Sequence, residues 1–287
     1  MRTSLERGAG LLMPISSLPS PFGIGTLGAA AYEFVDWLKR ARQKYWQVLP
    51  VGPTSYGDSP YQSFSAFAGN PYFIDLDTLV KEGLLTYEEI NACYWGENPS
   101  KVAYDAIFYY RFPLLRKAFE RSGHKGTEAF EDFCRENENW LPDYSLYMAC
   151  KAHFEHREWL TWDEDIRFRK PEAVKKYGEM LGEDVEFWQF LQYKFFEQWN
   201  KLRIYANDQG IKIIGDIPIY VALDSADVWV HPELFQLDKK YFTPLRVAGV
   251  PPDYFCADGQ LWGNPLYDWD AMRDDGFGWW IRRIDGA

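Results

Sequence analysis

The pattern that most restricts the fold lies near the start of the chain, where two short apolar runs flank an amphipathic segment. Residues Ala9–Ile15 form the first run, which predicts a buried strand that ends in a loop. Tyr45–Val51 forms the second, and the segment between them has apolar residues at helical spacing. That stripe consists of Ala30, Phe34, Trp37, Leu38 and Ala41. Two strands joined by a helix form a βαβ unit, which predicts a parallel sheet.

A third strand is predicted at Ile211–Val221, and Asp216 lies where this strand becomes a loop. Carboxylates at the C-terminal ends of parallel strands are the usual site residues of a β/α barrel. An aspartate before a proline-containing turn can equally cap backbone donors, and the sequence leaves both interpretations open.

Residues Leu84–Ala206 separate the second strand from the third and are mostly helical and charged in pattern. The clearest helix ends before Gly210, which is expected at the C′ position. Its apolar stripe consists of Trp188, Leu191, Phe195, Trp199 and Leu202. We therefore expect an α/β fold in three parts: residues 1–83 begin the barrel, 84–206 form an inserted helical subdomain, and 207–287 continue the barrel.

Two aromatic segments are candidates for ligand binding. Pro53–Tyr72 is long and aromatic for a simple connection, and such loops are often functional. Gly249–Tyr267 holds rings among prolines and glycines, so we expect a turn-rich loop that is neither a helix interior nor a central strand. Its rings and polar groups are Tyr254, Phe255, Trp262, Tyr267, Asp253, Asp258 and Asn264. Flat rings beside carboxylates and amides suit a sugar, although a packed surface loop would have the same composition.

The composition of the chain restricts the kinds of partner that the protein is expected to bind. The formal net charge of −11 disfavours nucleic acid and anionic membranes as partners. The cysteines have no metal-like spacing, which indicates free thiols in a reducing compartment, and the N-terminal octapeptide has no apolar targeting run. These features predict a soluble, cytoplasmic protein. No phosphate-binding glycine motif is present, and His153 and His156, at i and i+3 of a predicted helix, are expected to be solvated or packed rather than metal-binding.

Four stretches resemble the 4-α-glucanotransferases known as amylomaltase or disproportionating enzyme, glycoside hydrolase family 77. They are Gly10–Pro19 with Phe22–Gly25, Gly57–Pro71, Gly215–Val221 with Asp224–Trp229, and Gly249–Tyr267. The stretches are long, follow the family's order and span most of the chain.

The resemblance implies a (β/α)₈ TIM-barrel type of fold with insertions and a retaining transglycosylation. In that reaction an aspartate attacks the anomeric carbon of an α-1,4-glucan while a glutamate protonates the leaving sugar. A maltodextrin would serve as donor, and glucose or another maltodextrin as acceptor. The family's chemistry requires no metal and no organic cofactor.

The resemblance also implies roles for individual residues. Asp216 matches an aspartate that contacts the donor-site sugar, and Tyr61 matches a tyrosine that stacks on it. Trp262 matches an acceptor-side tryptophan. Tyr254 and Phe255 match the aromatic wall of a mobile loop beside it. Asp253 and Asn264 lie at matching positions, and all seven residues are expected to bind substrate.

The catalytic carboxylates are expected to lie outside this chain. Arg283-Ile284-Asp285 looks like the start of the family's nucleophile motif, but Gly286-Ala287 stands where the motif has His-Phe. The preceding residues align better with the helix before the fourth barrel strand. We therefore expect Asp285 to be a surface residue of a helix, and neither nucleophile nor acid/base among residues 1–287.

The chain would then hold about three barrel strands, which cannot close a barrel. We expect the remainder of the same enzyme to complete it, and residues 1–287 to be inactive alone. Two alternatives remain open: a glucan hydrolase of the α-amylase clan, and a glucan-binding piece without catalysis. Comparison of the products formed with and without added glucose would distinguish the hydrolase from a transferase. Glucan binding that is lost in Trp262→Ala or Tyr61→Ala would support the binding piece without catalysis.

Overall fold

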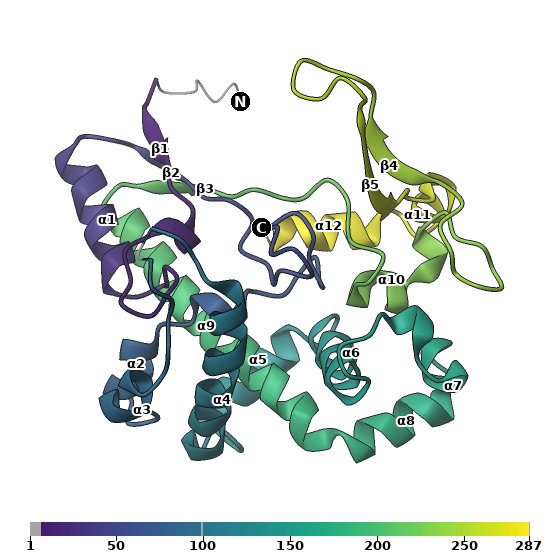
Figure 1. The fold of residues 1–287 in the computed structure, drawn as a ribbon, viewed down its shortest axis with the longest axis horizontal. Coiled ribbons are helices and arrows are strands. Elements are labelled where there is room, and N and C mark those ends of the chain that lie inside the picture. The colour runs from purple at the N-terminus through teal and green to yellow at the C-terminus, as the bar shows by residue number, and fades with distance from the viewer. Residues whose placement is uncertain (1–6, 99, 287) are drawn as a thin grey trace. The chain divides into compact units, whose positions relative to one another are not determined.

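The computed structural model describes residues 7–98 and 100–286, and it has a mixed helical and sheet structure (Figure 1). The N-terminal octapeptide, which is expected to hold no targeting run, lies largely outside these residues. The described chain forms two compact units. Unit 1 comprises the chain up to Val51, Gly69–Phe133 and Phe190–Asp216, and unit 2 comprises Gly52–Ala68, Cys134–Gln189 and the chain from Ile217 onward.

The sheet of unit 1 has three parallel strands in the order β1-β2-β3, side by side in Figure 1. They are β1 (Gly10–Leu12), β2 (Tyr45–Gln47) and β3 (Lys212–Ile214). Helix α1 (Ala29–Arg40) joins β1 to β2, which confirms the predicted βαβ unit. The indole of Trp46 is fully buried and its Nε1 donates to Met13 O at 2.8 Å.

Three details of this βαβ unit were predicted wrongly. The strands are shorter than the apolar runs, and all of β1 is exposed, with Leu12 53% accessible. Among the described strands, β1 and β3 pair only with β2, so each lacks the neighbours that would bury it. The buried stripe of α1 is Ala31, Val35 and Leu38, whereas Trp37 is 46% accessible and stacks on Phe34.

The predicted helical character of residues 84–206 is confirmed, and no strand occurs among the residues described there. The helices from residue 76 to 208 are α2 (Leu76–Lys81), α3 (Tyr87–Asn91), α4 (Tyr104–Arg121), α5 (Glu128–Glu136), α6 (Leu141–His153), α7 (Glu164–Arg167), α8 (Pro171–Met180) and α9 (Gly182–Asp208). Short 3₁₀ turns lie at Ile15–Ser17, Pro71–Phe73, Trp159–Thr161 and Pro232–Leu234. Helix α6 ends at His153, so the prediction that His156 shares this helix is wrong. The three-part division of the chain stays a prediction.

Helix α9 follows the predicted pattern closely. Leu191, Phe195 and Leu202 are fully buried, as the apolar stripe requires. At its end Gly210 has φ +80°, and Ile211 N donates to Ala206 O while Gly210 N donates to Asn207 O. This pair of bonds is a Schellman motif with glycine in the left-handed position.

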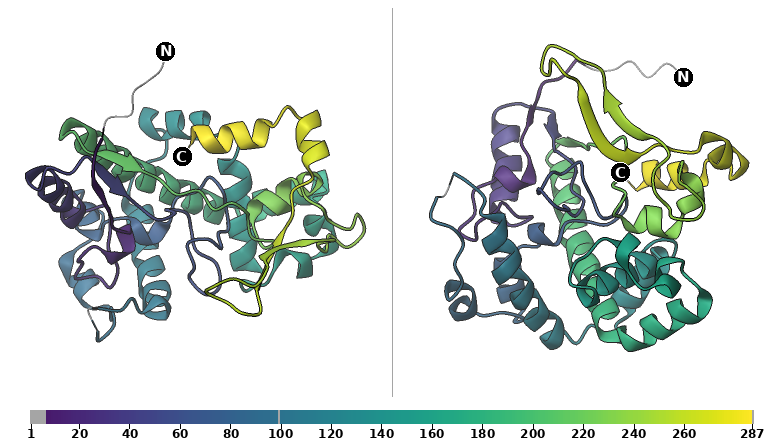
Figure 2. Two further views of the ribbon diagram at one scale, coloured as in Figure 1. Left: turned by 90° about the horizontal axis from the view of Figure 1, so that it is seen from above. Right: turned by 45° about the vertical axis from the view of Figure 1, so that its right-hand side comes forward.

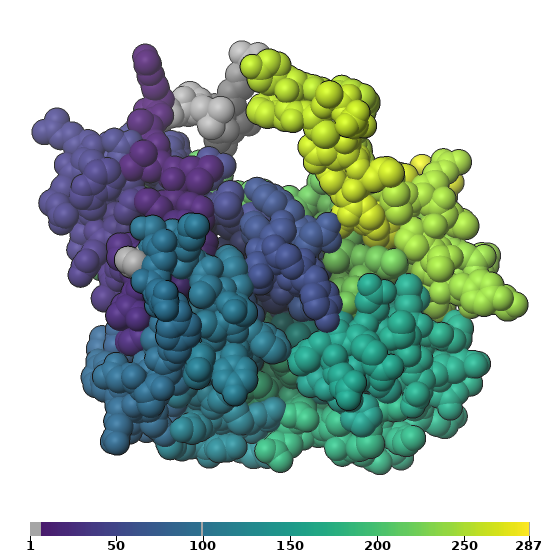
Figure 3. Space-filling model, in the orientation of Figure 1, coloured from purple at the N-terminus to yellow at the C-terminus, as the bar shows by residue number. Residues whose placement is uncertain are grey.

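Unit 2 contains α6–α8 and an antiparallel hairpin of β4 (Val247–Val250) and β5 (Gln260–Pro265). It also contains α10 (Ala226–Val230), α11 (Trp269–Asp274), α12 (Gly278–Asp285) and the first part of α9. Gly249–Tyr267 lies in neither a helix interior nor a central strand, as predicted, but the hairpin that these residues mostly form was not predicted; it projects from the rest of unit 2 (Figures 2 and 3). Pro251 and Pro252 lie just past β4, where no ladder donor is needed.

The prediction for Asp285 is confirmed, since it is the exposed last residue of α12. Within the described part of the chain, no helix is both long and apolar enough to cross a membrane. Cys93, Cys134, Cys150 and Cys256 are all free, as their spacing predicted.

Candidate functional site

The tip of the β4–β5 hairpin presents two rings to solvent. Tyr254 is 99% and Phe255 90% accessible, and the rings meet edge to face at 5.7 Å. Asp253 shapes the turn, because its Oδ1 accepts hydrogen bonds from Phe255 N at 2.9 Å and Cys256 N at 2.8 Å. This local bonding is typical of aspartate in turns. The tip therefore holds large apolar surfaces that are available to a ligand.

Trp262 lies on β5 and is 40% accessible. Its Nε1 donates to Gln260 Oε1 at 2.9 Å, and its ring centroid lies 6.3 Å from that of Tyr220. The indole is thus held by neighbours while part of its surface remains open. A half-exposed, oriented indole is what stacking on a sugar ring requires.

Tyr61 belongs to the loop Gly52–Ala68, which is closed by its own hydrogen bonds. Ser55 N donates to Gln62 O at 2.8 Å, and Thr54 and Ser63 form an isolated antiparallel bridge. Tyr61 N donates to Ser59 Oγ at 3.3 Å, and the side chain is 45% accessible. The loop is therefore held together by hydrogen bonds between its own residues.

Side-chain contacts of Gln62 join this loop to the hairpin. Gln62 Nε2 donates to Asn264 Oδ1 at 3.1 Å, and it lies 3.5 Å from Trp262 O. Asn264 is 3% accessible, and its Nδ2 donates to Val221 O at 2.8 Å. The structure thus brings the segments of Tyr61 and Trp262 together, and Asn264 uses both ends of its amide inside the protein.

Asp216, the seventh predicted site residue, belongs to unit 1. It follows β3 by two residues and is half-buried. Its position where the strand becomes a loop is confirmed. The other six predicted site residues all lie in unit 2.

A buried ionic cluster supports the segment that leads into α10. Asp224 Oδ2 accepts from Lys151 Nζ at 2.6 Å, and Oδ1 accepts from Tyr147 Oη at 2.7 Å and from Trp159 N at 3.2 Å. Lys151 is 1% accessible, and its other donors reach His156 O and Arg157 O, both at 3.0 Å. Burial, together with the Asp224 carboxylate, raises the pKa of Tyr147.

Sequence reasoning missed the roles of Lys151 and Gln62. For Lys151 a signal existed, because it is a single cation within the apolar stretch of α6, where a lysine is buried only when paired. For Gln62 no signal existed, since a polar residue in a loop is unremarkable by itself.

Tyr267 and Arg283 form a second buried group. Tyr267 is 2% accessible and stacks on Tyr220 with centroids 5.9 Å apart. Arg283 Nη1 donates to Tyr267 Oη at 3.2 Å, and Nη2 donates to Pro218 O. Burial raises the pKa of Tyr267 to about 12. Arg283 therefore fixes the segment after Asp216, and Tyr267 is a packing residue rather than part of an open aromatic surface.

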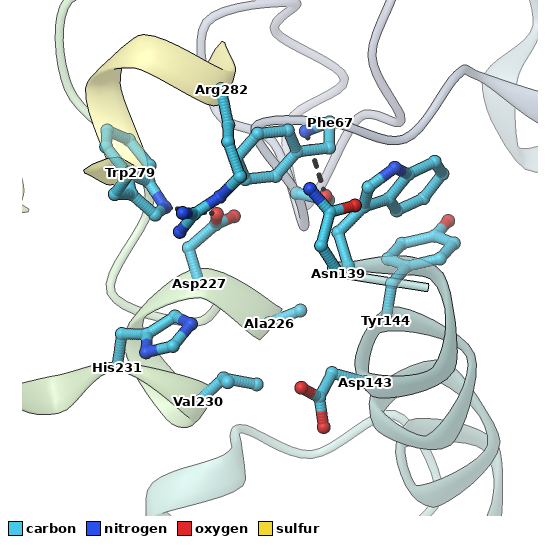
Figure 4. A pocket seen from close by; sticks show the side chains of 12 residues that line it. Phe67, Asn139, Asp143, Tyr144, Ala226, Asp227, Val230, His231, Trp279 and Arg282 are labelled. Atoms are coloured by element: carbon cyan, nitrogen blue, oxygen red, sulfur yellow. Dashed lines mark hydrogen bonds between the residues drawn. The ribbon is translucent and has the colours of Figure 1, made fainter. Parts of the chain in front are cut away.

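A pocket in unit 2 lies among the loop Gly52–Ala68, the start of α6, α10 and α12 (Figure 4). Asp227 accepts from Ala66 N at 2.8 Å and from Trp279 Nε1 at 3.2 Å, and burial raises the pKa of this carboxyl. Asp143 pairs with Arg169 at 2.6 Å. Both carboxylates already have partners within the protein, Asp227 in hydrogen bonds and Asp143 in an ion pair. We therefore interpret the residues around the pocket as contacts that hold the loop Gly52–Ala68 in place.

Among the residues with described positions, no group of three or more histidine, cysteine, aspartate or glutamate side chains is placed to hold a metal ion.

Comparison with known proteins gives one consistent group. The family model described as 4-alpha-glucanotransferase matches residues 13–287. The 4-alpha-glucanotransferase of Clostridium butyricum is 53% identical over 275 residues, which cover 96% of this chain and 56% of that protein. The 4-alpha-glucanotransferase of Streptococcus pneumoniae is 51% identical over 281 residues, 97% of this chain and 55% of that protein.

Among solved structures, the amylomaltase from Streptococcus agalactiae in complex with acarbose has a TM-score of 0.93 at 47% identity, and the match covers 98% of this chain and 57% of that one. The chain thus spans about half the length of the relatives it matches.

Proposed function

Because this chain belongs to the 4-alpha-glucanotransferase family, we propose that its protein transfers segments of an α-1,4-glucan from a maltodextrin donor to a glucose or maltodextrin acceptor. One observation supports this assignment above the others. Two half-exposed rings, Tyr61 and Trp262, lie on segments that are bonded to each other through Gln62 and Asn264. Two oriented rings on linked segments suit a ligand made of repeated sugar rings.

The proposed fold is the first part of a (β/α)₈ barrel, in which β1, β2 and β3 are consecutive barrel strands and the helices between β2 and β3 are an insertion. The parallel order of the sheet and the similarity to the Streptococcus agalactiae amylomaltase support it. The division into residues 1–83, 84–206 and 207–287 belongs to this proposal.

In the proposed site, Tyr61 stacks on a donor sugar. Asp216, just after β3, accepts hydrogen bonds from hydroxyls of that sugar. Trp262, Tyr254 and Phe255 form the acceptor wall, where Asp253 shapes the turn that presents the last two rings. An acceptor held against rings competes with water for the glycosyl group, so transfer is favoured over hydrolysis.

The reaction proposed is a double displacement with retention. A carboxylate attacks the anomeric carbon, and a carboxylic acid of raised pKa protonates the leaving sugar through an oxocarbenium-like transition state. We propose that residues 1–287 supply the substrate-binding side and neither of these two groups. The chemistry needs no cofactor, and the free thiols support a reducing compartment such as the cytoplasm.

Maltotriose supplied to the complete protein tests the proposal. We expect glucose together with longer maltodextrins and no net gain of reducing ends, whereas residues 1–287 alone should form neither product. Equal release of reducing ends with and without added glucose would instead identify a hydrolase. Disproportionation by purified residues 1–287 would refute the proposed division of the site.

The role of Trp262 is tested with a matched control. Trp262→Ala in the complete protein should lower kcat/KM for transfer by about tenfold, the loss expected when one aromatic contact is removed. Trp37→Ala is the control, since Trp37 is similarly exposed but lies on α1 of unit 1. Equal effects of the two substitutions would contradict the role given to Trp262.

A further inference from the structure

Asn264 is unlike the other predicted site residues of unit 2, because its side chain is buried. Its Oδ1 accepts from Gln62 Nε2 at 3.1 Å and its Nδ2 donates to Val221 O at 2.8 Å. With 3% accessibility and both amide ends bonded, it has little surface to offer a ligand. The geometry indicates a role in holding other residues.

The three segments that meet at Asn264 each carry an aromatic ring. Gln62 directly follows Tyr61 in the loop, and Val221 directly follows Tyr220. Asn264 lies two residues after Trp262 on β5, and the Tyr220 ring lies 6.3 Å from the Trp262 ring. A single buried amide therefore connects backbone positions next to all three rings.

Several neighbouring hydrogen bonds do not link the loop to the hairpin. Those of Ser55 N and Gln62 N stay within the loop, and further along the loop Phe64 O accepts from Ala226 N and Ala66 N donates to Asp227, which ties the loop to α10. The bond from Trp262 Nε1 to Gln260 stays within β5. Between Gln62 and the hairpin, the second contact, to Trp262 O at 3.5 Å, starts from the same Nε2 atom. Loss of this one donor would thus remove both contacts.

We propose that Gln62 and Asn264 are positioning residues, which keep the Tyr61 ring and the Trp262 ring at a fixed separation so that one glucan chain is bound by both. The proposal rests on the proposed function, in which these two rings bind sugars. A ligand long enough to reach both rings gains from their fixed spacing, because less conformational freedom is lost on binding. A ligand that contacts one ring gains nothing from it.

The test uses Gln62→Met, which keeps the length of the side chain but cannot donate a hydrogen bond. Gln62 is half-buried, so the variant is expected to fold. Gln43→Met is the matched control, because Gln43 Nε2 donates to the nearby Ala41 O at 3.0 Å, a local contact in unit 1. Gln62→Lys restores a donor with a different group and should recover part of the effect.

The first measurement needs no ligand. Hydrogen exchange should become severalfold faster in both the 54–63 and the 260–266 segments of Gln62→Met, and in neither segment of Gln43→Met. Faster exchange in the loop alone would contradict the proposed role of Gln62 in linking the loop to the hairpin. This result does not depend on whether the protein binds glucans.

The second measurement is the binding of maltoheptaose and of maltose by calorimetry. In Gln62→Met the affinity for maltoheptaose should fall about fivefold, roughly the effect of one hydrogen bond, with little change for maltose. Equal losses for both ligands, or none for either, would overturn the proposal. If exchange behaves as expected but the unsubstituted protein binds neither sugar, the proposed function fails, and with it the role of the pair in glucan binding.

Discussion

Replacing Lys151 by methionine should lower the free energy of unfolding by about 3 kcal/mol, because it leaves the Asp224 carboxylate without its cation. The Lys151 side chain is 1% and the Asp224 side chain 17% accessible, and they meet at 2.6 Å. Breaking such a pair by removing one partner costs about 3–5 kcal/mol. Water can reach part of Asp224, so the lower end of this range applies.

The two carbonyl acceptors of Lys151 contribute little to this cost. His156 O also accepts from Tyr56 Oη at 2.9 Å, and Arg157 O also accepts from Trp162 Nε1 at 3.2 Å. Each carbonyl therefore keeps one partner in the variant. Methionine also fills much of the volume of the lysine stem, which limits the cavity that forms. The expected loss thus comes mainly from the carboxylate.

The assay is urea unfolding followed by tryptophan fluorescence and circular dichroism, with Lys175→Met as control. The Lys175 side chain is 78% accessible, and its ion pair with Glu179 spans 3.9 Å, so its loss should change stability by less than about 0.5 kcal/mol. In a double-mutant cycle with Asp224→Asn, the two losses should not add, with a coupling of about 1–3 kcal/mol. A loss below about 1 kcal/mol in Lys151→Met, or simple additivity, would refute the reasoning.

Two further predictions concern stability. Hydrogen bonding from Arg121 lowers the pKa of Glu89 from 4.5 to about 2, so this contact stabilises the protein above about pH 4.5 and is lost as the pH falls toward 2. Arg121→Met should therefore differ from the unsubstituted protein at pH 7 and much less at pH 2.5, whereas a pH-independent difference in melting temperature would contradict this origin. Gly210→Ala should destabilise the protein by about 1 kcal/mol, because Gly210 has φ +80°. Gly178→Ala, inside α8 with open space at its Cβ, should stabilise it by roughly 0.5–1 kcal/mol, and thermal unfolding that shows the same sign for both changes would rule out the conformational explanation.

The sequence alone determined the features that depend on local periodicity and turn chemistry. The stripe of α9 and the glycine that ends it were predicted correctly, because helical spacing and a left-handed C′ residue are properties of a few consecutive residues. The βαβ unit followed for the same reason. The family resemblance, too, rested on long local motifs, and the family match over residues 13–287 confirms it.

Tertiary structure decided which groups became buried and paired. Apolar residues of β1 were predicted to be buried but are exposed. Burial depends on neighbouring strands and helices, and the sequence of one strand does not determine whether these are present. The hairpin of β4 and β5 was missed because proline and glycine near its turn concealed the pairing of its arms. Lys151 and Asp224 are 73 residues apart in sequence, and Gln62 and Asn264 are 202 apart. No local pattern encodes such contacts, because the free energy that fixes them arises only when distant segments are brought together.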